Sequence, residues 1–472
     1  MAKILMVASE ATPFIKTGGL ADVAGSLPAA LKERGEDVAV VLPRYREARI
    51  DGARRVAENI AVWLGQAKYS VDVQLAVERG VPYYFIDCPA LYDREGIYVN
   101  GDGDFPDNHI RFAVLAKAAF GIIRYVYRPD ILHCHDWQAS LAPVYLKTAL
   151  AGDPTFMGIR TVLTIHNLGY QGIFPPAMLP QIGLDTGVFT IGGLEFFGNL
   201  NLLKGGIVYS DAITTVSKGY ACEIQTEEYG FGLDGLLRDR SSALTGILNG
   251  VDYSLWNPET DNYIAAHYSV DDLSGKSACK LDLLRKFGLP DEAAERPLIG
   301  IVSRFAGQKG FDLIEEIASD LASEDVTIVA LGTGEMRYED LFRRLAASHP
   351  GKIAVRIAYD NPLAHKIEAG ADMFLMPSLY EPCGLNQIYS LRYGTVPVVR
   401  ATGGLDDTID EGTGFKFKEY SGAALLATLR DALAAWQNRE RWKELMRNGM
   451  RKDFSWNASA GEYAALYHRL LG

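Results

Sequence analysis

The chain has 472 residues, 48% of them hydrophobic and 22% charged, which is typical of a globular protein too long for a single core, so two domains are expected. Its formal net charge of −12 at pH 7 argues against nucleic acid or an anionic membrane surface as the main partner. No stretch approaches the roughly 18 uninterrupted apolar residues that would span a membrane.

The first half of the chain alternates between short apolar runs and helical patterns. Residues 3–8 predict a buried strand, residues 22–34 a helix, and residues 37–42 a second strand. This βαβ unit implies a parallel sheet that binds ligands at the carboxyl ends of its strands. The other strands expected in this half are 71–77 and 81–87, as an appended hairpin, and 131–134, 161–165, 212–216 and 244–248. The other helices expected here are 109–125, 138–150, 200–208 and 218–226.

The pattern starts again after a turn-rich segment, residues 249–258, which we interpret as a hinge. The strands expected beyond it are 298–303, 326–331, 353–357, 372–376 and 396–399. The helices expected beyond it are 311–321, 338–347, 423–435, 439–450 and 458–471. The predicted fold is therefore α/β, with two doubly wound Rossmann-like domains, residues 1–248 and 259–457, and a ligand in the cleft between them.

A glycine-bearing loop follows the first strand. Gly18 and Gly19 would let the backbone approach a ligand closely, and Lys16 supplies a cation beside them. The spacing is neither G-x-G-x-x-G nor the Walker pattern, which disfavours a dinucleotide dehydrogenase and a P-loop. The alternative is that the glycines only make a turn.

A second loop, after the strand at 298–303, carries Arg304 and Lys309 on either side of a glycine and just before a helix. Two cations at a helix start could clamp a diphosphate and stabilise the charge that grows on a leaving group. The alternative is an ordinary surface pair of basic residues.

A third loop lies within residues 378–394, SLYEPCGLNQIYSLRYG, which follow the strand at 372–376. We expect a helix to begin at Glu381 and Pro382, since proline suits a first helical turn. A carboxylate beside unpaired helix-start amides suits a ligand with many oxygens, such as a sugar or phosphate. The amides concerned are those of Cys383, Gly384 and Leu385. The alternative is that Glu381 only complements the helix dipole.

Histidines mark the ends of two further strands. The run His133-Cys134-His135-Asp136 places both histidines on one strand face and Asp136 at the strand end, facing the substrate. A metal site there would need further ligands, and none occurs at a matching spacing. His166 likewise ends the strand at 161–165.

Taken in order, the K-T-G-G-L loop and the HDW, IHN, LNGVD, SRF…QKG and EPCGL…Q stretches resemble the bacterial glycogen synthases of the starch synthase type, over essentially the full length. That resemblance implies the GT-B architecture and a retaining glucosyltransferase that extends an α-1,4-glucan at its non-reducing end from ADP-glucose. It implies no metal and no organic cofactor. It also implies an acceptor-side first domain, on which residues 458–472 pack back, and a donor-side second domain.

The resemblance assigns roles to individual residues. Arg304 and Lys309 would clamp the diphosphate, and Lys16 with the amides of Gly18 and Gly19 would complete the phosphate site. The remaining roles implied are nucleobase stacking for Tyr359, donor-sugar binding for Glu381 and the amides of Cys383, Gly384 and Leu385, and places around the reacting centre and acceptor path for His166, Asp136, Asn249 and Asp22.

Two positions depart from related sequences. Tyr389 stands eight residues after Glu381, where eukaryotic glycogen synthases and many other GT-B enzymes carry a second glutamate. Asn386 stands where a threonine is expected. Since the sequence designates no carboxylate nucleophile, we expect same-face attack in which the leaving phosphate helps to deprotonate the acceptor.

Other functions on the same architecture are a silent glucan- or nucleotide-sugar-binding protein, a phosphorylase and an epimerase. Retention of Lys16, Arg304, Lys309 and Glu381 together argues against the binding protein, and no pyridoxal-lysine context is found for a phosphorylase. Five scattered cysteines without a CxxC, and an N-terminus without signal-peptide features, predict a cytoplasmic protein. No motif indicates an oligomeric state.

Overall fold

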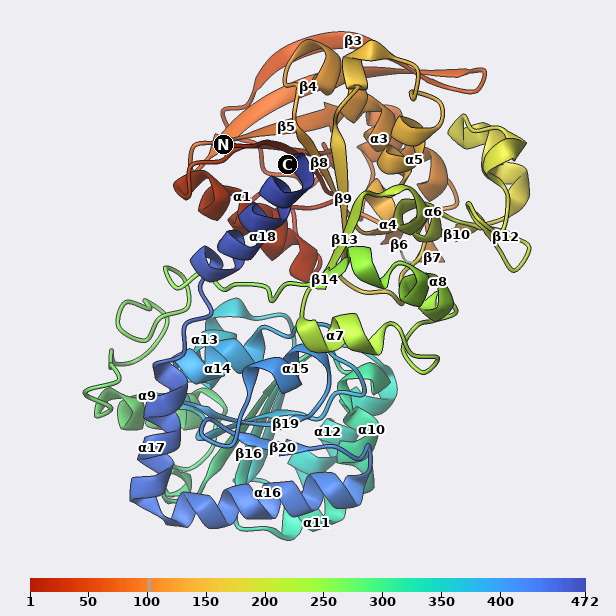
Figure 1. Ribbon diagram of the computed structural model, residues 1–472. Coiled ribbons are helices and arrows are strands. Elements are labelled where there is room, and N and C mark those ends of the chain that lie inside the picture. The colour runs from red at the N-terminus through yellow and green to blue at the C-terminus, as the bar shows by residue number, and fades with distance from the viewer. Residues whose placement is uncertain (101–102) are drawn as a thin grey trace. The chain divides into compact units, whose positions relative to one another are not determined.

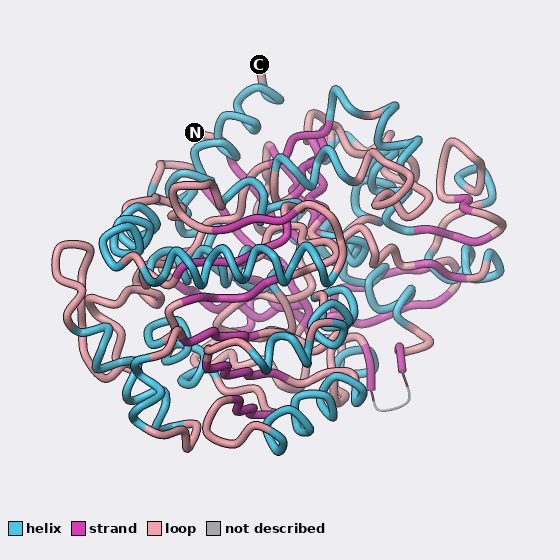
Figure 2. Tube along the Cα trace, turned by 90° about the horizontal axis from the view of Figure 1, so that it is seen from below, coloured by secondary structure: helices cyan, strands magenta, loops and turns pink. Residues whose placement is uncertain are grey.

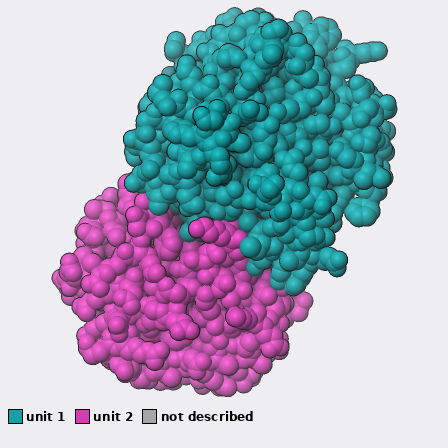
Figure 3. Space-filling model, viewed as in Figure 1, with its two compact units in different colours: residues 1–216, 221–250, 456–472 teal, residues 217–220, 251–455 magenta. Residues whose placement is uncertain are grey.

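The computed structural model describes residues 1–100 and 103–472 (Figure 1). The chain divides into two compact units (Figure 3). Unit 1 comprises residues 1–216, 221–250 and 456–472, and unit 2 comprises residues 217–220 and 251–455. Residues 251–258, predicted to be hinge, thus belong to unit 2, and residues 456–457, predicted for the second domain, belong to unit 1.

Unit 1 is built on a nine-stranded sheet with the order β14-β13-β9-β8-β1-β2-β5-β4-β3. The strands from β14 to β5 pair in parallel, and β3 and β4 add antiparallel pairing at one edge. Its strands are β1 Lys3–Val7, β2 Asp37–Pro43, β3 Arg54–Leu64, β4 Ala67–Glu78, β5 Val81–Asp87, β8 Ile131–His135, β9 Arg160–Ile165, β13 Ala212–Thr215 and β14 Leu244–Gly246. Small sheets add β6 Val99–Asn100, β7 Gly103–Asp104, β10 Ile173–Phe174, β11 Glu195–Phe196 and β12 Asn199–Asn201.

The sequence analysis missed β3. Its residues RRVAENIAVWL do not alternate strictly, and its register with β4 shifts twice, between Arg55 and Ala57 and between Ala57 and Ile60. Most of its side chains are exposed or half-buried, so the apolar period of two that indicates a strand is weak. The predicted hairpin, β4 and β5, is present as part of the main sheet.

Helices of unit 1 complete its layers. They are α1 Gly19–Glu33, α2 Pro89–Tyr92, α3 Asn108–Tyr125, α4 Asp136–Ala139, α5 Leu141–Lys147, α6 Leu202–Tyr209, α8 Asp234–Asp239 and α18 Trp456–Leu471, with α7 Lys218–Glu223 crossing the unit boundary. The helix expected over residues 138–150 is instead divided into α4 and α5. Helix α18 packs against α1, and Trp456 and Tyr463 join the core formed by Ile4 and Val40 of the sheet.

Unit 2 is a wholly parallel six-stranded sheet with the order β17-β16-β15-β18-β19-β20 and helices flanking its strands (Figure 2). Its strands are β15 Leu298–Val302, β16 Thr327–Gly332, β17 Ile353–Ile357, β18 Met373–Met376, β19 Val396–Arg400 and β20 Phe415–Phe417. Its helices are α9 Gly275–Lys286, α10 Phe311–Glu316, α11 Ala318–Ser323, α12 Met336–Ser348, α13 Asn361–Gly370, α14 Asn386–Arg392, α15 Gly403–Thr408, α16 Gly422–Gln437 and α17 Arg439–Met450. The strand β20 was not predicted.

Short 3₁₀ helices occupy several connections of both units. They are η1 Pro154–Phe156, η2 Pro176–Ile182, η3 Thr186–Val188, η4 Ser241–Ala243, η5 Asp291–Glu295 and η6 Gly307–Lys309. Within the described part of the chain, no helix has the length and apolar character needed to cross a membrane.

Each of the two large sheets has one point at which the strand order reverses. In unit 1 the chain runs outward from β1 to β2 and β5, and then in the other direction from β8 to β9, β13 and β14. In unit 2 it runs from β15 to β16 and β17, and then from β18 to β19 and β20. Ligands of doubly wound sheets bind at the carboxyl ends of the strands at such a reversal. The loops after β1, β8, β15 and β18 are therefore the places to look for a site.

Candidate functional site

The reversal in unit 2 brings Lys309 and Glu381 together. The Lys309 ammonium lies 2.6 Å from Oε2 of Glu381, and the two side chains are 23% and 7% exposed. The Ser378 hydroxyl donates to the same carboxylate oxygen at 3.1 Å. A cation and a carboxylate from the loops after two neighbouring strands thus neutralise one another at the edge where a ligand is expected.

A glycine allows this close approach of the two loops. Gly310 has φ +77°, and a Cβ on it would stand 2.0 Å from the carbonyl oxygen of Pro377. The backbone amide of Leu379 also donates to the carbonyl of Gln308 at 2.9 Å. The loop after β15 and the loop after β18 are therefore in direct backbone contact.

The predicted helix start at Glu381 and Pro382 is wrong, because α14 begins at Asn386. Gly384 intervenes with φ +68°, a left-handed conformation that interrupts the helix. Asn386 stands where the resemblance led us to expect threonine. Its side-chain Nδ2 donates to the carbonyl of Val302 at 2.7 Å and ties α14 to the end of β15. The residues from Glu381 to Leu385 therefore form a turn that precedes the helix.

Gln387 holds this turn from inside. Its Nε2 donates to the carbonyl of Cys383 at 3.0 Å and to that of Gly384 at 3.1 Å. A Cβ on Gly384 would lie 2.5 Å from Oε1 of Gln387, so the turn also requires glycine at this position. This role of Gln387 in holding the turn was not predicted from the sequence.

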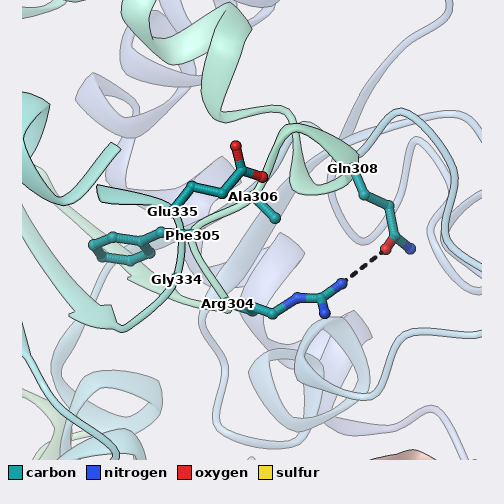
Figure 4. A pocket seen from close by; sticks show the side chains of 6 residues that line it. All are labelled: Arg304, Phe305, Ala306, Gln308, Gly334 and Glu335. Atoms are coloured by element: carbon teal, nitrogen blue, oxygen red, sulfur yellow. Dashed lines mark hydrogen bonds between the residues drawn. The ribbon is translucent and has the colours of Figure 1, made fainter. Parts of the chain in front are cut away.

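A cavity of about 350 Å³ opens beside Arg304 (Figure 4). Its lining residues are Arg304, Phe305, Ala306, Gln308, Gly334 and Glu335. The Arg304 guanidinium reaches Oε1 of Gln308 at 3.1 Å and forms no ion pair with any described residue, whereas the Glu335 carboxylate points away from it and accepts the Gly307 amide at 3.2 Å. The cavity thus offers an uncompensated cation to an anionic ligand.

Tyr359 follows β17, at the same edge of the unit 2 sheet. Its side chain is 85% exposed, and it does not line the cavity at Arg304. An aromatic ring this exposed has a free face on which a flat ligand could stack. The position fits the predicted contact with a nucleobase, which stays a prediction.

At the reversal in unit 1, Glu10 organises the glycine-bearing loop. Its carboxylate is buried and accepts hydrogen bonds from the amide and hydroxyl of Thr17, from the Gly18 amide at 3.2 Å and from the Tyr98 hydroxyl at 2.9 Å. The Gly18 amide, predicted to bind phosphate, is thus occupied by Glu10 here. The sequence analysis assigned no role to Glu10, although an acid directly after a buried strand was a signal.

Lys16 is also paired within its own loop. Its ammonium lies 2.8 Å from both carboxylate oxygens of Asp22, a residue predicted to lie near the reacting centre and acceptor path. Burial is the main influence on Asp22 and raises the pKa of its carboxyl, although Lys16 opposes the shift. A Cβ built on Gly18 or Gly19 meets no atom within 4 Å, so the fold itself leaves open space beside both glycines.

Asp136 and His166 meet at the ends of the neighbouring strands β8 and β9. Oδ1 of Asp136 accepts the backbone amide of His166 at 2.7 Å, and the Asn167 amide also donates to this carboxylate. Asp136 has φ +57°, a strained conformation for a residue with a side chain. Burial raises the pKa of Asp136 to about 7 despite these hydrogen bonds.

Three histidine rings pack together beside this carboxylate. The ring centroids of His133 and His135 are 4.3 Å apart, and those of His135 and His166 are 5.3 Å apart. Nδ1 of His135 lies 3.0 Å from Nε2 of His166. Burial lowers the pKa of all three, that of His135 to about 3, so the rings are neutral near pH 7.

His133 is a structural residue of the core. Its Nδ1 pairs with the Tyr467 hydroxyl at 2.8 Å and its Nε2 with the Thr164 hydroxyl at 2.6 Å. In residues 1–100 and 103–472, no three or more His, Cys, Asp or Glu side chains gather in a way that could hold a metal ion.

Asn249 follows β14, at the outer edge of the unit 1 sheet. It is buried, and its side-chain oxygen has no hydrogen-bond partner among the described residues. No hydrogen bond joins it to Asp136 or His166 in the described chain. The structure thus brings Asp136, His135 and His166 together in unit 1, and Lys309, Glu381 and Ser378 together in unit 2.

Comparisons with known proteins give one consistent picture. A family model described as the starch synthase catalytic domain matches residues 3–239, and one described as glycosyl transferases group 1 matches residues 287–448. Proteins named glycogen synthase are similar along the whole chain: that of Koribacter versatilis is 53% identical over 99% of this chain and 98% of its own, and that of Anaeromyxobacter dehalogenans is 49% identical over 99% of both.

Solved structures agree. The catalytic domain of starch synthase IV from Arabidopsis thaliana, bound to ADP and acarbose, is similar with a TM-score of 0.92 and 30% identity over 100% of this chain and 99% of that chain. Sucrose-phosphate synthase from Thermosynechococcus elongatus, at 16% identity and a TM-score of 0.63 over 100% of this chain and 99% of that one, shares the fold.

Each unit is doubly wound around a sheet of mainly parallel strands and carries polar side chains at its reversal point. Together with the comparisons, this defines a glycosyltransferase of the GT-B class. Within that class, the chain belongs to the glycogen synthase family. It is a hexosyltransferase, and specifically a glucosyltransferase that elongates a glucan. The predicted fold, class and enzyme type are confirmed, and the alternatives of a binding protein, a phosphorylase or an epimerase are set aside.

Proposed function

We propose that this enzyme transfers glucose from ADP-glucose to the 4-hydroxyl at the non-reducing end of an α-1,4-glucan, with retention at the anomeric carbon. The observation that carries the proposal is the Lys309–Glu381 ion pair beside Arg304 at the reversal point of unit 2. The structural relative that is bound to ADP and acarbose supports an adenine nucleotide donor over UDP-glucose.

Arg304 and Lys309 would hold the diphosphate. Arg304 has no carboxylate partner in the described chain, so its guanidinium can bind two phosphate oxygens at once. The ammonium of Lys309 is free to turn from Glu381 to phosphate, because the incoming anion replaces the charge that Glu381 supplies in the ligand-free protein. The cavity of about 350 Å³ falls in the size range of small-molecule sites, and Tyr359 would stack on the base.

Glu381 would then bind the sugar. With Lys309 engaged by phosphate, the Glu381 carboxylate can accept hydrogen bonds from sugar hydroxyls while keeping the Ser378 hydroxyl as a donor. The amides of Cys383, Gly384 and Leu385 lie in the turn that Gln387 holds, and they would contribute further donors. This assigns Glu381 to sugar binding rather than to nucleophilic attack.

Glucosyl transfer passes through an oxocarbenium-like transition state, so negative charge grows on the departing phosphate. Arg304 and Lys309 would stabilise that charge, and Lys16 would join them once it leaves Asp22. His166, Asp136 and Asn249 would surround the reacting centre and the acceptor path. The leaving phosphate would take the acceptor proton on the same face, and neither a metal nor an organic cofactor would take part.

The same proposal places the reaction in the cytoplasm. All five cysteines are free thiols, and four of them are buried, which fits a reducing compartment.

The test is to incubate the pure protein with glycogen and radiolabelled ADP-glucose or UDP-glucose. Label should enter the polymer from ADP-glucose, and β-amylase should release it as maltose if it was added through an α-1,4 bond at the non-reducing end. No incorporation from either donor would overturn the proposal. Trapping of a glucosyl-enzyme adduct by mass spectrometry would overturn only the same-face step.

A further inference from the structure

His135 and Asp136 are consecutive, and both hold His166. Asp136 accepts the backbone amide of His166 at 2.7 Å, while the His135 ring makes a 3.0 Å contact with the His166 ring. The pairing of β8 with β9 sets this arrangement, because His135 lies opposite Thr164, two residues before His166. One dipeptide therefore fixes both the main chain and the side chain of a residue assigned to the reacting centre.

The contact between the rings joins two neutral imidazoles. Each neutral imidazole carries one proton, on Nδ1 or on Nε2. Nδ1 of His135 faces Nε2 of His166, so one of these atoms donates and the other accepts. The identity of the donor in this contact therefore fixes the tautomer of both rings.

The unpaired atom of His135 decides between the two arrangements. Its Nε2 is buried and has no hydrogen-bond partner among the described residues. If His166 donated, the proton of His135 would sit on that Nε2 as a buried N–H without an acceptor. If His135 donates through Nδ1, its Nε2 carries no proton and is only an acceptor without a donor. Orphaned buried N–H groups are rarer than under-satisfied acceptors, so the second arrangement is favoured.

We propose that His135 is a positioning residue that fixes His166 in the tautomer with its proton on Nδ1, so that His166 presents a neutral N–H donor to an oxygen of the bound sugar. Nδ1 of His166 makes no hydrogen bond to any described residue, which leaves this donor available. The His135 ring packs against the tilted rings of both His133 and His166, and this packing keeps the His166 ring plane in place. The ligand in this inference rests on the proposed function, whereas the tautomer rests on the contact between the two neutral rings and on the unpaired Nε2 of His135.

The tautomer can be read without substrate. Full-length protein labelled with ¹⁵N-histidine is studied by long-range ¹⁵N–¹H correlation spectra, and the His166 signals are assigned from the spectrum of His166→Gln. We expect the proton of His166 on Nδ1 in the wild type. His135→Leu should move it to Nε2 or to a mixture. His135→Asn, whose amide nitrogen can donate from about the place of Nδ1, should keep it on Nδ1.

Kinetics provide the second readout. His135→Leu should lower kcat roughly tenfold to a hundredfold with little change in KM. The reason is that His166 loses its hydrogen bond to the sugar oxygen, which strengthens in the transition state. His135→Asn should recover most of that loss. The matched control is His109→Leu, another buried histidine of unit 1 with one ring nitrogen paired, to Gln181, and the other unpaired. It should lower stability without selectively lowering kcat.

An Nε2–H tautomer of His166 in the wild type would overturn the inference. So would a folded His135→Leu variant with an unchanged tautomer and unchanged kcat, or a His135→Asn variant as slow as His135→Leu. Absence of glucosyl transfer by the wild type would instead defeat the proposed function, and the spectra would still test the tautomer.

Discussion

The carbonyl oxygen of Pro377 occupies the space in which any side chain on Gly310 would begin, since a Cβ there would lie only 2.0 Å away. This contact holds the loop after β15 against the loop after β18, and with them Lys309 beside Glu381. The placement of the Lys309 and Glu381 charges therefore depends on a residue that has no side chain.

Gly310→Ala should damage both stability and activity. The substitution combines the clash with Pro377 and a left-handed backbone, φ +77°, so it should lower the free energy of unfolding by roughly 2–4 kcal/mol. Thermal unfolding and glucosyl transfer are the measurements. Gly152→Ala, where a Cβ meets no atom within 4 Å, is the control and should change neither. Equal behaviour of the two variants would show that the close approach does not hold the loops.

Under the proposed function, Lys309→Ala should lower kcat/KM by roughly 10²–10³-fold, because it removes a cation assigned to the departing phosphate. It also leaves the buried Glu381 carboxylate without its partner, so the melting temperature should fall. Adding Glu381→Gln should restore much of the melting temperature but none of the activity. Arg343→Ala, which breaks exposed ion pairs on α12, should leave both near the wild-type values. Intact turnover in Lys309→Ala would remove the clamp from the mechanism.

Asp136 should make stability depend on pH. Its carboxyl has a pKa of 3.8 when unperturbed and about 7 in the folded protein, mainly because of burial. Between these values the folded state holds the proton and the unfolded state does not. Its contribution to stability is therefore fully present below pH 3.8 and is lost as the pH rises through about 7.

The variant that checks this is Asp136→Asn, which keeps an oxygen acceptor for the His166 amide but does not titrate. Melting temperatures of both proteins are measured from pH 5 to pH 8, and their difference cancels the opposing contribution of the buried histidines. The wild type should lose stability relative to Asp136→Asn as the pH rises. Two parallel curves would mean that burial does not raise the pKa of the Asp136 carboxyl.

Glu10→Gln should loosen the glycine-bearing loop. The new amide group would face the donors of Thr17 and Gly18 in place of a carboxylate oxygen, at a loss of roughly 1–3 kcal/mol. Hydrogen exchange at the Thr17 and Gly18 amides should accelerate, and activity should fall. Tyr98→Phe removes only one of the hydrogen bonds to Glu10 and should have a smaller effect. Unchanged exchange in Glu10→Gln would show that other contacts hold the loop.

The sequence predicted the two sheets because buried parallel strands are continuous apolar runs with no competing pattern. It placed Lys16, Asp136, His166, Arg304 and Lys309 at strand ends for the same reason. It failed at α14, where Pro382 looked like a helix start. The deciding contacts there, from Asn386 to Val302 and from Gln387 to Cys383, join residues whose proximity depends on the tertiary fold or on the turn itself.

Roles that depend on hydrogen bonds formed in the folded chain could not be predicted from the sequence either. Glu10 reads as an ordinary acid until the fold brings Tyr98 and the Thr17 and Gly18 amides to it. The pairing of Lys16 with Asp22 joins two residues whose charges were considered separately. A pattern of residue types states what a side chain can do, whereas its partner is set by the folded chain.

Unit 1 is interrupted in the sequence, since unit 2 lies almost entirely between residues 250 and 456. Trp456, Tyr463 and Tyr467 fill the core beside Ile4 of β1 and Val40 of β2. These two strands are synthesised well before the three aromatic residues. During synthesis, the continuous segment 251–455 can fold as soon as it emerges. The core of the larger first sheet stays incomplete until residues 456–472 have also been synthesised. Chaperones that bind nascent chains would therefore bind the incomplete unit 1 for longer than unit 2.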